Sequence, residues 1–136
     1  MNLLQNLLHT LFFQLEGLKA KYPGIVIQHG FPSSAPVGLM IALEHDKTKV
    51  DTQHELAGFR RRPRVFFADI YATDIWNRNG ICEEIKNLFE NKNFPVLNES
   101  KQETGVTMIS EGIRIEVDHV QEGKKARVKI YMCTLV

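Results

Sequence analysis

The residues best suited to binding chemistry are crowded into one stretch, which runs from Glu44 to Arg64. Four of the five residues from Arg60 to Arg64 are arginine, and guanidinium groups hold phosphates or carboxylates through paired hydrogen bonds. The same stretch contains four acids, which are Glu44, Asp46, Asp51 and Glu55. This mixture of charges favours a protein partner over a nucleic acid, although a solvated basic start to a strand would give the same run of arginines.

Histidines and carboxylates in this stretch are also groups that zinc and similar ions accept as ligands. The candidates are His45, Asp46, His54 and Glu55. Closed metal sites usually show tighter ligand spacing, so we expect no metal here.

The chain offers little for catalysis. Ser33-Ser34, Cys82 and Cys133 stand in no recognisable nucleophile motif, and the nine glycines form no phosphate-binding loop. The adjacent acids Glu83-Glu84 would point in different directions on a helix, which makes them poor partners for acid–base chemistry. We therefore expect neither an enzyme nor a cofactor-binding protein.

The charged stretch lies between two apolar runs, Val37–Leu43 and Val65–Tyr71, which both look like core strands. Unpaired charges are costly to desolvate, so the stretch cannot be buried. Connections this long are uncommon in compact domains and tend to be functional or disordered. We interpret it as a loop held out for a partner. Its predicted partner-binding residues are His45, Asp46, Lys47, Lys49, Asp51, His54, Glu55, Phe59, Arg60, Arg61, Arg62 and Arg64.

The composition indicates a single globular domain over residues 1–136, because 43% of the residues are apolar and 24% are charged. The formal net charge of +1 predicts neither a nucleic-acid nor a membrane partner. The apolar N-terminus has no basic leader, and no run of about eighteen apolar residues predicts a membrane span. Cys82 and Cys133 lie far apart, which favours free thiols in a reducing cytosol and leaves a disulfide open.

Apolar spacing predicts two helices. Residues 2–21 carry leucines and phenylalanines at intervals of three and four, which places them on one stripe, and Pro23-Gly24 ends this helix. Residues 80–91 repeat the pattern, and either Asn77 or Asn79 could cap that helix.

Runs of β-branched and alternating apolar residues predict the strands. We expect them at 24–28, 37–43, 64–73, 106–109, 113–118 and 127–132. A turn at 121–124 would join the last two strands as a hairpin. Because strands adjacent in sequence usually pair as antiparallel hairpins, we expect an α+β two-layer sandwich. It would have a mainly antiparallel sheet, two helices packed on one face, and a long polar hairpin loop.

This order of elements, together with the oversized polar loop, resembles the tail terminator proteins of long-tailed bacteriophages, also called tail completion or head-tail joining proteins. The matching features are a leading amphipathic helix at 2–21, a hairpin at 37–73 with a long loop, a helix at about 80–91, and a closing hairpin at 112–136. The resemblance is one of architecture and spans nearly the whole chain. Other neck and tail-tube proteins share parts of this plan.

The resemblance implies a structural virion protein that forms a homohexameric ring, caps the tail tube, stops its polymerisation and supplies the surface to which the head docks. Its partners would be copies of itself, the tail-tube protein and a head-completion or connector protein. DNA would pass through the channel without sequence-specific binding. The protein would be assembled in the host bacterial cytoplasm and found in the virion tail or neck.

Two acids, Glu116 and Asp118, are candidates for facing such a channel because they lie on a polar strand face. Three competing hypotheses stand beside this one. The chain could be a nucleic-acid-binding module that uses the cluster Arg60–Arg64, another neck or tail-tube component, or a small ligand-binding or catalytic domain with a site between helices and sheet.

Overall fold

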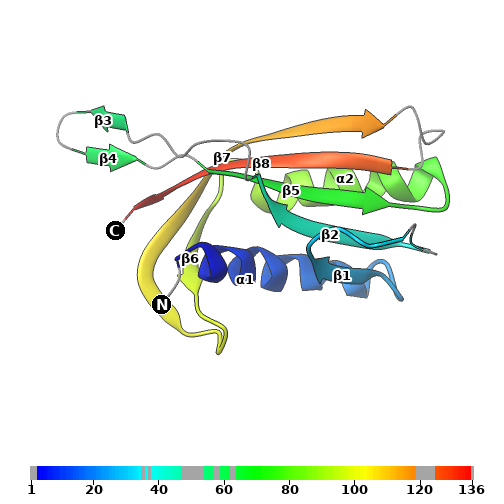
Figure 1. Cartoon of the computed structure of the whole chain (residues 1–136), viewed down its shortest axis with the longest axis horizontal. Coiled ribbons are helices and arrows are strands. Elements are labelled where there is room, and N and C mark those ends of the chain that lie inside the picture. The colour runs from blue at the N-terminus through cyan, green and yellow to red at the C-terminus, as the bar shows by residue number, and fades with distance from the viewer. Residues whose placement is uncertain are drawn as a thin grey trace.

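A computed structural model describes residues 3–34, 36, 38–46, 54–56, 59–61, 64–118 and 125–135 (Figure 1). Two helices, one 3-10 helix and eight strands occur in this part of the chain. In chain order they are α1 (Leu3–Leu15), η1 (Glu16–Ala20), β1 (Val26–His29), β2 (Met40–His45), β3 (His54–Leu56), β4 (Phe59–Arg61), β5 (Arg64–Tyr71), α2 (Ile75–Phe89), β6 (Asn93–Leu97), β7 (Glu103–Asp118) and β8 (Lys125–Leu135).

The fold is α+β. Among the described residues, six strands form one mixed sheet in the order β1-β2-β5-β8-β7-β6. The strands β1 and β2 are parallel, with Val26 opposite Met40, and the other neighbours are antiparallel. The expectation that the first two strands pair as an antiparallel hairpin is therefore wrong. The loop between Gly30 and Leu39 is long enough to return the chain to the start of its neighbour, so β2 runs in the same direction as β1.

The predicted hairpin around the charged stretch is confirmed. The strands β2 and β5 are antiparallel, from Met40 opposite Tyr71 to His45 opposite Phe66. Between them, β3 and β4 pair with each other in a separate two-stranded sheet. Figure 1 shows this small hairpin beyond the end of the six-stranded sheet.

The second helix begins earlier than expected, at Ile75 and not near residue 80. The carboxylate of Asp74 caps it, since Oδ1 accepts a hydrogen bond from the backbone N–H of Asn77 at 2.8 Å. Asn77 and Asn79, the predicted caps, both lie inside the helix. The first turn of the helix was not predicted because Gly80 suggested that the helix begins there. In the structure Gly80 lies inside the helix.

The remaining boundaries differ in smaller ways. The first helix is α-helical to Leu15 and continues as the 3-10 helix η1. The strand β6 was not expected, and the two strands expected at 106–109 and 113–118 form one strand, β7, whose pairing with β8 shifts register between Ser110 and Gly112. The turn predicted at 121–124 lies outside the described residues.

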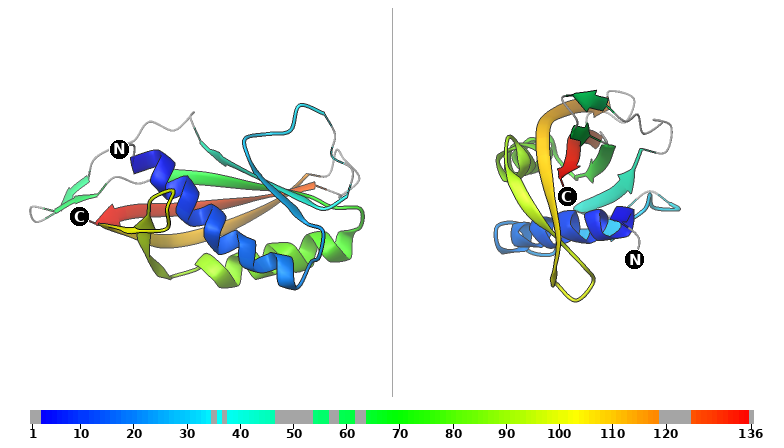
Figure 2. Two further views of the ribbon diagram at one scale, coloured as in Figure 1. Left: turned by 90° about the horizontal axis from the view of Figure 1, so that it is seen from below. Right: turned by 90° about the vertical axis from the view of Figure 1, so that its left-hand side faces the viewer.

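Both helices contribute to one hydrophobic core on the inner side of the curled sheet, as the right-hand view of Figure 2 shows. Leu7 and Leu11 of α1 and Ile85 of α2 are fully buried there with Phe66 and Ile130. In the part of the chain that the structure describes, neither helix is long and apolar enough to cross a membrane.

Candidate interaction surface

The side of the sheet that faces away from the core carries a cluster of charged and aromatic side chains. Successive residues of a strand point to opposite faces, so the residues between the core positions of β5, β7 and β8 share this side. We call this surface the outer face. Its residues are Phe67, Asp69, Tyr71, Arg114, Glu116, Lys125, Arg127 and Lys129.

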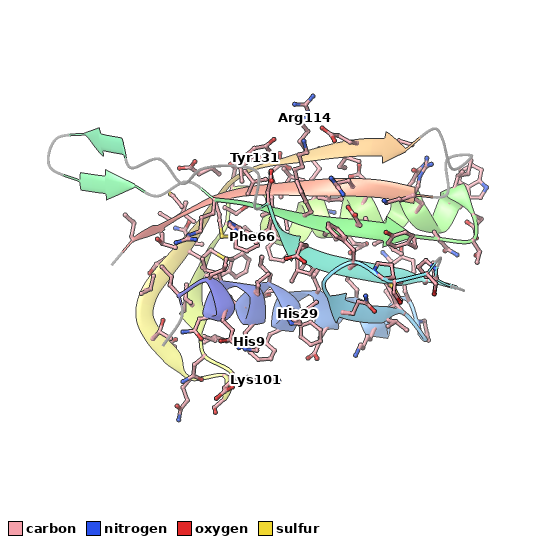
Figure 3. All side chains as sticks on the ribbon, in the orientation of Figure 1. His9, His29, Phe66, Lys101, Arg114 and Tyr131 are labelled. Carbon is pink, nitrogen blue, oxygen red and sulfur yellow. The ribbon has the colours of Figure 1, made fainter. Side chains whose placement is uncertain are left out.

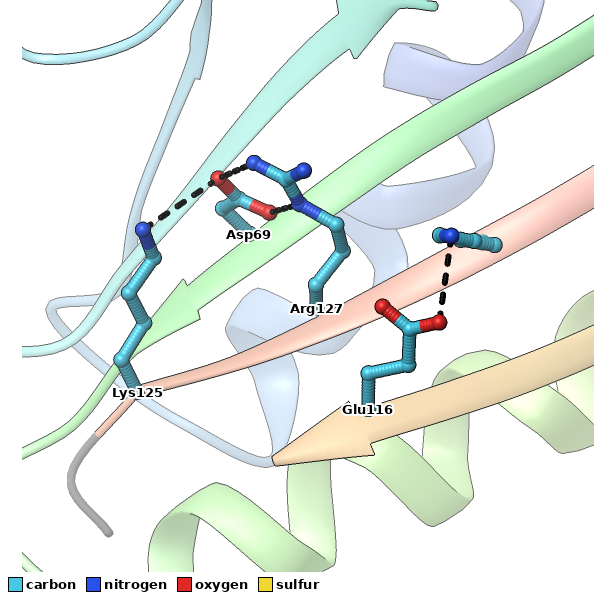
Figure 4. A network of polar contacts seen from close by, with 5 residues as sticks. Asp69, Glu116, Lys125 and Arg127 are labelled. Carbon is cyan, nitrogen blue, oxygen red and sulfur yellow. Dashed lines mark hydrogen bonds and ion pairs between the residues drawn. The ribbon is translucent and has the colours of Figure 1, made fainter. Parts of the chain in front are cut away.

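Asp69 is the buried acid around which the cations of the outer face are arranged. Its side chain is fully buried, and its direct cross-strand neighbour is Arg127. The Arg127 Nε donates to Oδ1 at 2.7 Å and Nη2 donates to Oδ2 at 3.0 Å, while Nζ of Lys125 lies 3.8 Å from Oδ2 (Figure 4). The hydrogen bonds to Asp69 raise the pKa of the Arg127 guanidinium. A buried carboxylate thus holds two cations in place.

Aromatic rings support the same cations. The guanidinium of Arg127 lies 4.2 Å from the ring centroid of Phe67 and 5.6 Å from that of Phe31. Nζ of Lys125 lies 5.2 Å from the ring of Tyr71. Such cation–π contacts keep a charged group ordered without neutralising it.

Glu116 organises the neighbouring part of the outer face. Its Oε1 lies 3.1 Å from Nζ of Lys129 and 3.5 Å from Nε of Arg114. The Arg114 side chain is 68% exposed, and Figure 3 shows it extending away from the sheet. A hollow of about 270 Å³ lies beside this group, lined by Glu116, Val117, Lys125 and Arg127.

The loop after β1 forms a second hollow. It has a volume of about 540 Å³ and is lined by Gln28, Phe31, Pro32, Ser33, Ser34, Pro36 and Met40. Phe31 is 48% exposed and also lies near Arg127, so this loop borders the outer face. Ser33 and Ser34 therefore line a hollow beside the outer face.

The outer edge of β6 offers few backbone groups to a further strand. Lys92 O accepts from Ser110 N at 3.0 Å, so the alternating backbone turns Asn93 and Pro95 outward. Proline has no N–H to offer, and the N–H of Leu97 donates to Oγ1 of Thr10 at 2.9 Å. At the other edge of the sheet, Val26 N donates to Leu39 O.

The side of α2 opposite the core is unusually apolar at its start. Trp76 is 80% exposed and Ile75 is 46% exposed. Further along, Glu83 and Asn87 are also exposed, while Ile81, Cys82, Ile85 and Phe89 are buried. Burial raises the pKa of the Cys82 thiol to about 11, so it stays protonated at neutral pH and is a poor nucleophile.

Two histidines meet between α1 and β1 (Figure 3). The rings of His9 and His29 have centroids 5.9 Å apart, and His29 stacks on Phe12 at 5.1 Å. Burial, and next the positive potential of His9, lower the pKa of His29, while Glu44 opposes this shift. No cluster of three metal-binding side chains occurs among the described residues.

The structure describes only part of the predicted partner-binding loop. Asp46 is 4% exposed and Arg64 is 9% exposed, and the ring of His45 lies 5.2 Å from that of Phe66, so these three residues belong to the base of the loop. His54, Glu55, Phe59, Arg60 and Arg61 lie in β3 and β4, where the backbone pairing is described. Lys47, Lys49, Asp51 and Arg62 lie outside the described residues.

Of the two predicted channel acids, Glu116 lies on the outer face, and Asp118 ends β7 opposite Lys125. Asp69, Arg127 and Trp76 were not predicted from the sequence as functional residues. The signal was present for the first two, because one acid in an apolar strand and three alternating cations in another suggest cross-strand ion pairs.

Comparison with known proteins indicates a fold and no function. No family model matches the chain. No curated protein matches it. A solved structure whose name states no function is similar with a TM-score of 0.56 and 14% sequence identity, covering 96% of this chain and 93% of the other. At this identity the likeness supports the fold alone.

Proposed function

We propose that this chain is a structural virion protein that caps the end of a phage tail tube as a ring. It stops polymerisation of the tube and presents the surface to which the head docks. Its partners are further copies of itself, a tail-tube protein and a head-completion or connector protein. A hexameric ring, a channel that DNA crosses without sequence-specific binding, and a place in the tail or neck of the virion belong to the same proposal.

The observation that supports this proposal most is the β3–β4 hairpin. It forms its own two-stranded sheet at the far end of the β2–β5 pair, beyond the six-stranded sheet (Figure 1). An isolated two-stranded hairpin gains little stability by itself in water. A neighbouring protein that packs on it would supply the missing contacts, which suits an arm that reaches the tube or the next subunit.

The finer architecture fits the same role. In our proposal the fold is a two-layer sandwich, with α1 and α2 on one side of the sheet and the outer face left uncovered. A subunit of this shape has two broad sides for neighbours in a ring. Glu116 remains a candidate for facing the channel, since it is 40% exposed.

The proposal is tested with a tail-tube protein encoded in the same genome. Tubes grown with and without the purified chain are compared by electron microscopy, and we expect shorter tubes with a ring at one end. In an arm-deletion variant, a short Asn-Gly turn replaces residues 47–63, joining Asp46 to Arg64. Because β2 and β5 are already antiparallel there, this variant should fold and lose the capping activity.

Circular dichroism and urea unfolding of the arm-deletion variant establish that its core is intact. A folded variant that still caps tubes would remove the hairpin from the mechanism. A wild-type chain that neither shortens tubes nor binds their ends would overturn the proposed function.

The nucleic-acid-binding hypothesis has less support. Arg64, one of its four arginines, is buried at the start of β5. Binding by the cluster would weaken steeply with salt and fall when Arg60, Arg61 and Arg62 become alanine. Retention of wild-type affinity in that variant would exclude the cluster as the site.

A further inference from the structure

The six-stranded sheet has free backbone groups along β1, at the edge opposite β6. Val26 N and Gly30 N both donate to backbone carbonyls on the side of β2. Because alternate residues of a strand bond to the same neighbour, Ile27 and His29 turn their N–H and C=O groups away from β2. In the part of the chain that the structure describes, no hydrogen bond engages these groups. A further strand could pair with them.

We call the outward side of Val26–His29 the β1 edge. Natural proteins block an exposed sheet edge with charged residues, proline or a covering element. These four residues include no proline, lysine, arginine, aspartate or glutamate, and Val26 is 50% exposed. A strand this short makes few backbone bonds, so the side chains beside it must supply most of the specificity for a partner.

Two such features lie beside the β1 edge. Gln28 lines the hollow of about 540 Å³ together with Phe31 and Met40, which gives room for a large apolar side chain. Gly30 follows on the same side of the strand, and Oε2 of Glu44 lies 3.7 Å from the position that a Cβ would occupy there. Among the described residues, none forms an ion pair with Glu44. The edge therefore suits an extended segment in which a basic residue follows two positions after an apolar one.

The arm, residues 47–63, contains a strand with this order of residues. The strand β4 is Phe59-Arg60-Arg61, whereas β3 has no lysine or arginine. Among the described residues β4 pairs with β3 alone, so its other edge has no ladder partner. Figure 1 shows this hairpin at the left, well away from β1 of the same subunit. The β1 edge of a second copy is therefore the better partner for it.

We infer that β4 of one copy adds to the β1 edge of the next copy as a parallel strand. In this direction Phe59 lies beside Gln28 and the hollow. Arg61 then lies beside Glu44, because each pair of positions is separated by two residues. The inference rests on the proposed ring and names the strand and the edge that join its subunits. A nucleic acid fits this edge less well, because Glu44 would repel phosphates.

The pairing would also stabilise the arm. A two-stranded hairpin is marginal in water, and strands added to it form a sheet that can persist. The arm and the β1 edge are different parts of the subunit, so each copy gives one strand and receives another. Such a head-to-tail contact closes into a ring when the rotation per subunit allows.

The test uses a donor and a receiver. The receiver is the arm-deletion variant, which keeps the β1 edge and lacks β4. The donor carries His29→Pro, which keeps β4 and removes an outward N–H, so the ladder with β2 loses no bond. Sedimentation velocity over a concentration series measures self-association. We expect each variant to associate roughly tenfold more weakly than wild type, or worse, because a few central contacts dominate interfaces.

Mixing the donor and the receiver gives the sharpest result. The donor's β4 can pair with the receiver's intact β1 edge, so an equimolar mixture should form a one-to-one dimer and stop there. Hydrogen exchange at the Ile27 and His29 amides of the receiver should slow in this dimer. Glu99→Lys, an exposed change in the turn after β6, serves as the control and should associate like wild type.

A charge exchange tests the same contact without the proline variant. Glu44→Arg and Arg61→Glu should each weaken self-association, because each leaves two like charges at the contact. A chain that carries both substitutions should recover the wild-type association. A double variant as weak as the single variants would overturn the placement of β4 on the β1 edge.

The outcomes separate this inference from the proposed function. A wild-type chain that stays monomeric at its highest soluble concentration, or that associates without slowing exchange at the Ile27 and His29 amides, would overturn the inference. Rings that form in that way and still cap tail tubes would leave the proposed function standing. Association that the mixture and the charge exchange both restore supports the inference, even if the assemblies cap no tube and the proposed function falls.

Discussion

Asp69 and Arg127 are direct neighbours across the β5–β8 ladder, and two hydrogen bonds of 2.7 and 3.0 Å join the carboxylate to the guanidinium. The carboxylate is fully buried, while the arginine is 33% exposed. The buried acid thus determines the position of a cation that solvent and neighbouring molecules can reach. This geometry makes the outer face an ordered surface around Arg127.

Replacing Asp69 with alanine should destabilise the fold by about 2 kcal/mol. Removing one partner of a buried pair leaves the other charge uncompensated, and the partial exposure of Arg127 reduces the cost through solvent screening. Urea unfolding followed by circular dichroism measures the change. Glu116→Gln is the matched control, since its 40% exposed side chain should contribute no more than about 0.5 kcal/mol. Equal effects of the two substitutions would contradict this ranking.

Replacing Asp74 with alanine should cost about 1 kcal/mol, because it removes the cap of α2. The Asp74 carboxylate accepts from the backbone N–H of Asn77 at 2.8 Å and from its side-chain amide at 3.0 Å. Urea unfolding provides the measurement, and Asp74→Ser should retain most of the stability because serine is also a good cap. If Asn79→Ala were the more damaging change, the helix would begin near residue 80, as predicted from the sequence.

Replacing Thr10 with valine should destabilise the protein by about 1–2 kcal/mol, since it leaves a buried donor without a partner. Oγ1 of Thr10 donates to Asn6 O at 2.8 Å and accepts from Leu97 N at 2.9 Å, so it ties α1 to β6. Hydrogen exchange at the Leu97 amide should accelerate. Thr73→Val, at an exposed residue just before α2, should leave that amide as protected as in wild type.

Stability should fall as the pH drops below 6.5, because the folded state lowers the pKa of His29. The unfolded chain takes up this proton first, so the contribution of His29 is fully present above the unfolded pKa and is lost as pH falls toward the lower, folded pKa. NMR titration gives the pKa directly, and His9→Gln should raise it toward 6.5 by removing a nearby positive potential. A His29 pKa that is unchanged by this substitution would show that His9 has no electrostatic effect on it.

Local patterns in the sequence predicted much of the fold. The hairpin between β2 and β5 followed from two apolar runs that flank a charged stretch, and the core stripes of both helices followed from residues such as Leu7, Leu11, Ile81 and Ile85. These features depend on the burial of side chains that are close together in the sequence. The spacing of apolar residues along one sequence therefore reveals them.

The predictions failed where pairing between residues far apart in the sequence determines the structure. The parallel pairing of β1 with β2 depends on the path of the loop between Gly30 and Leu39, and both glycines that bracket it, Gly30 and Gly38, have positive φ angles. The union of two expected strands into β7 depends on a register shift near Ser110, which has no sequence signature of its own. The outer face was missed because its ion pairs join β5 and β8, which are more than fifty residues apart.

The outer edge of β6 differs from the other edge of the sheet because it offers few backbone groups to a further strand. Pro95 lacks an amide hydrogen, and Thr10 already occupies the amide of Leu97, so an approaching strand would find little to bond with on that margin. A further strand at this edge would therefore leave several of its own backbone groups without partners. A sheet with such an edge pairs poorly with a further strand on that side.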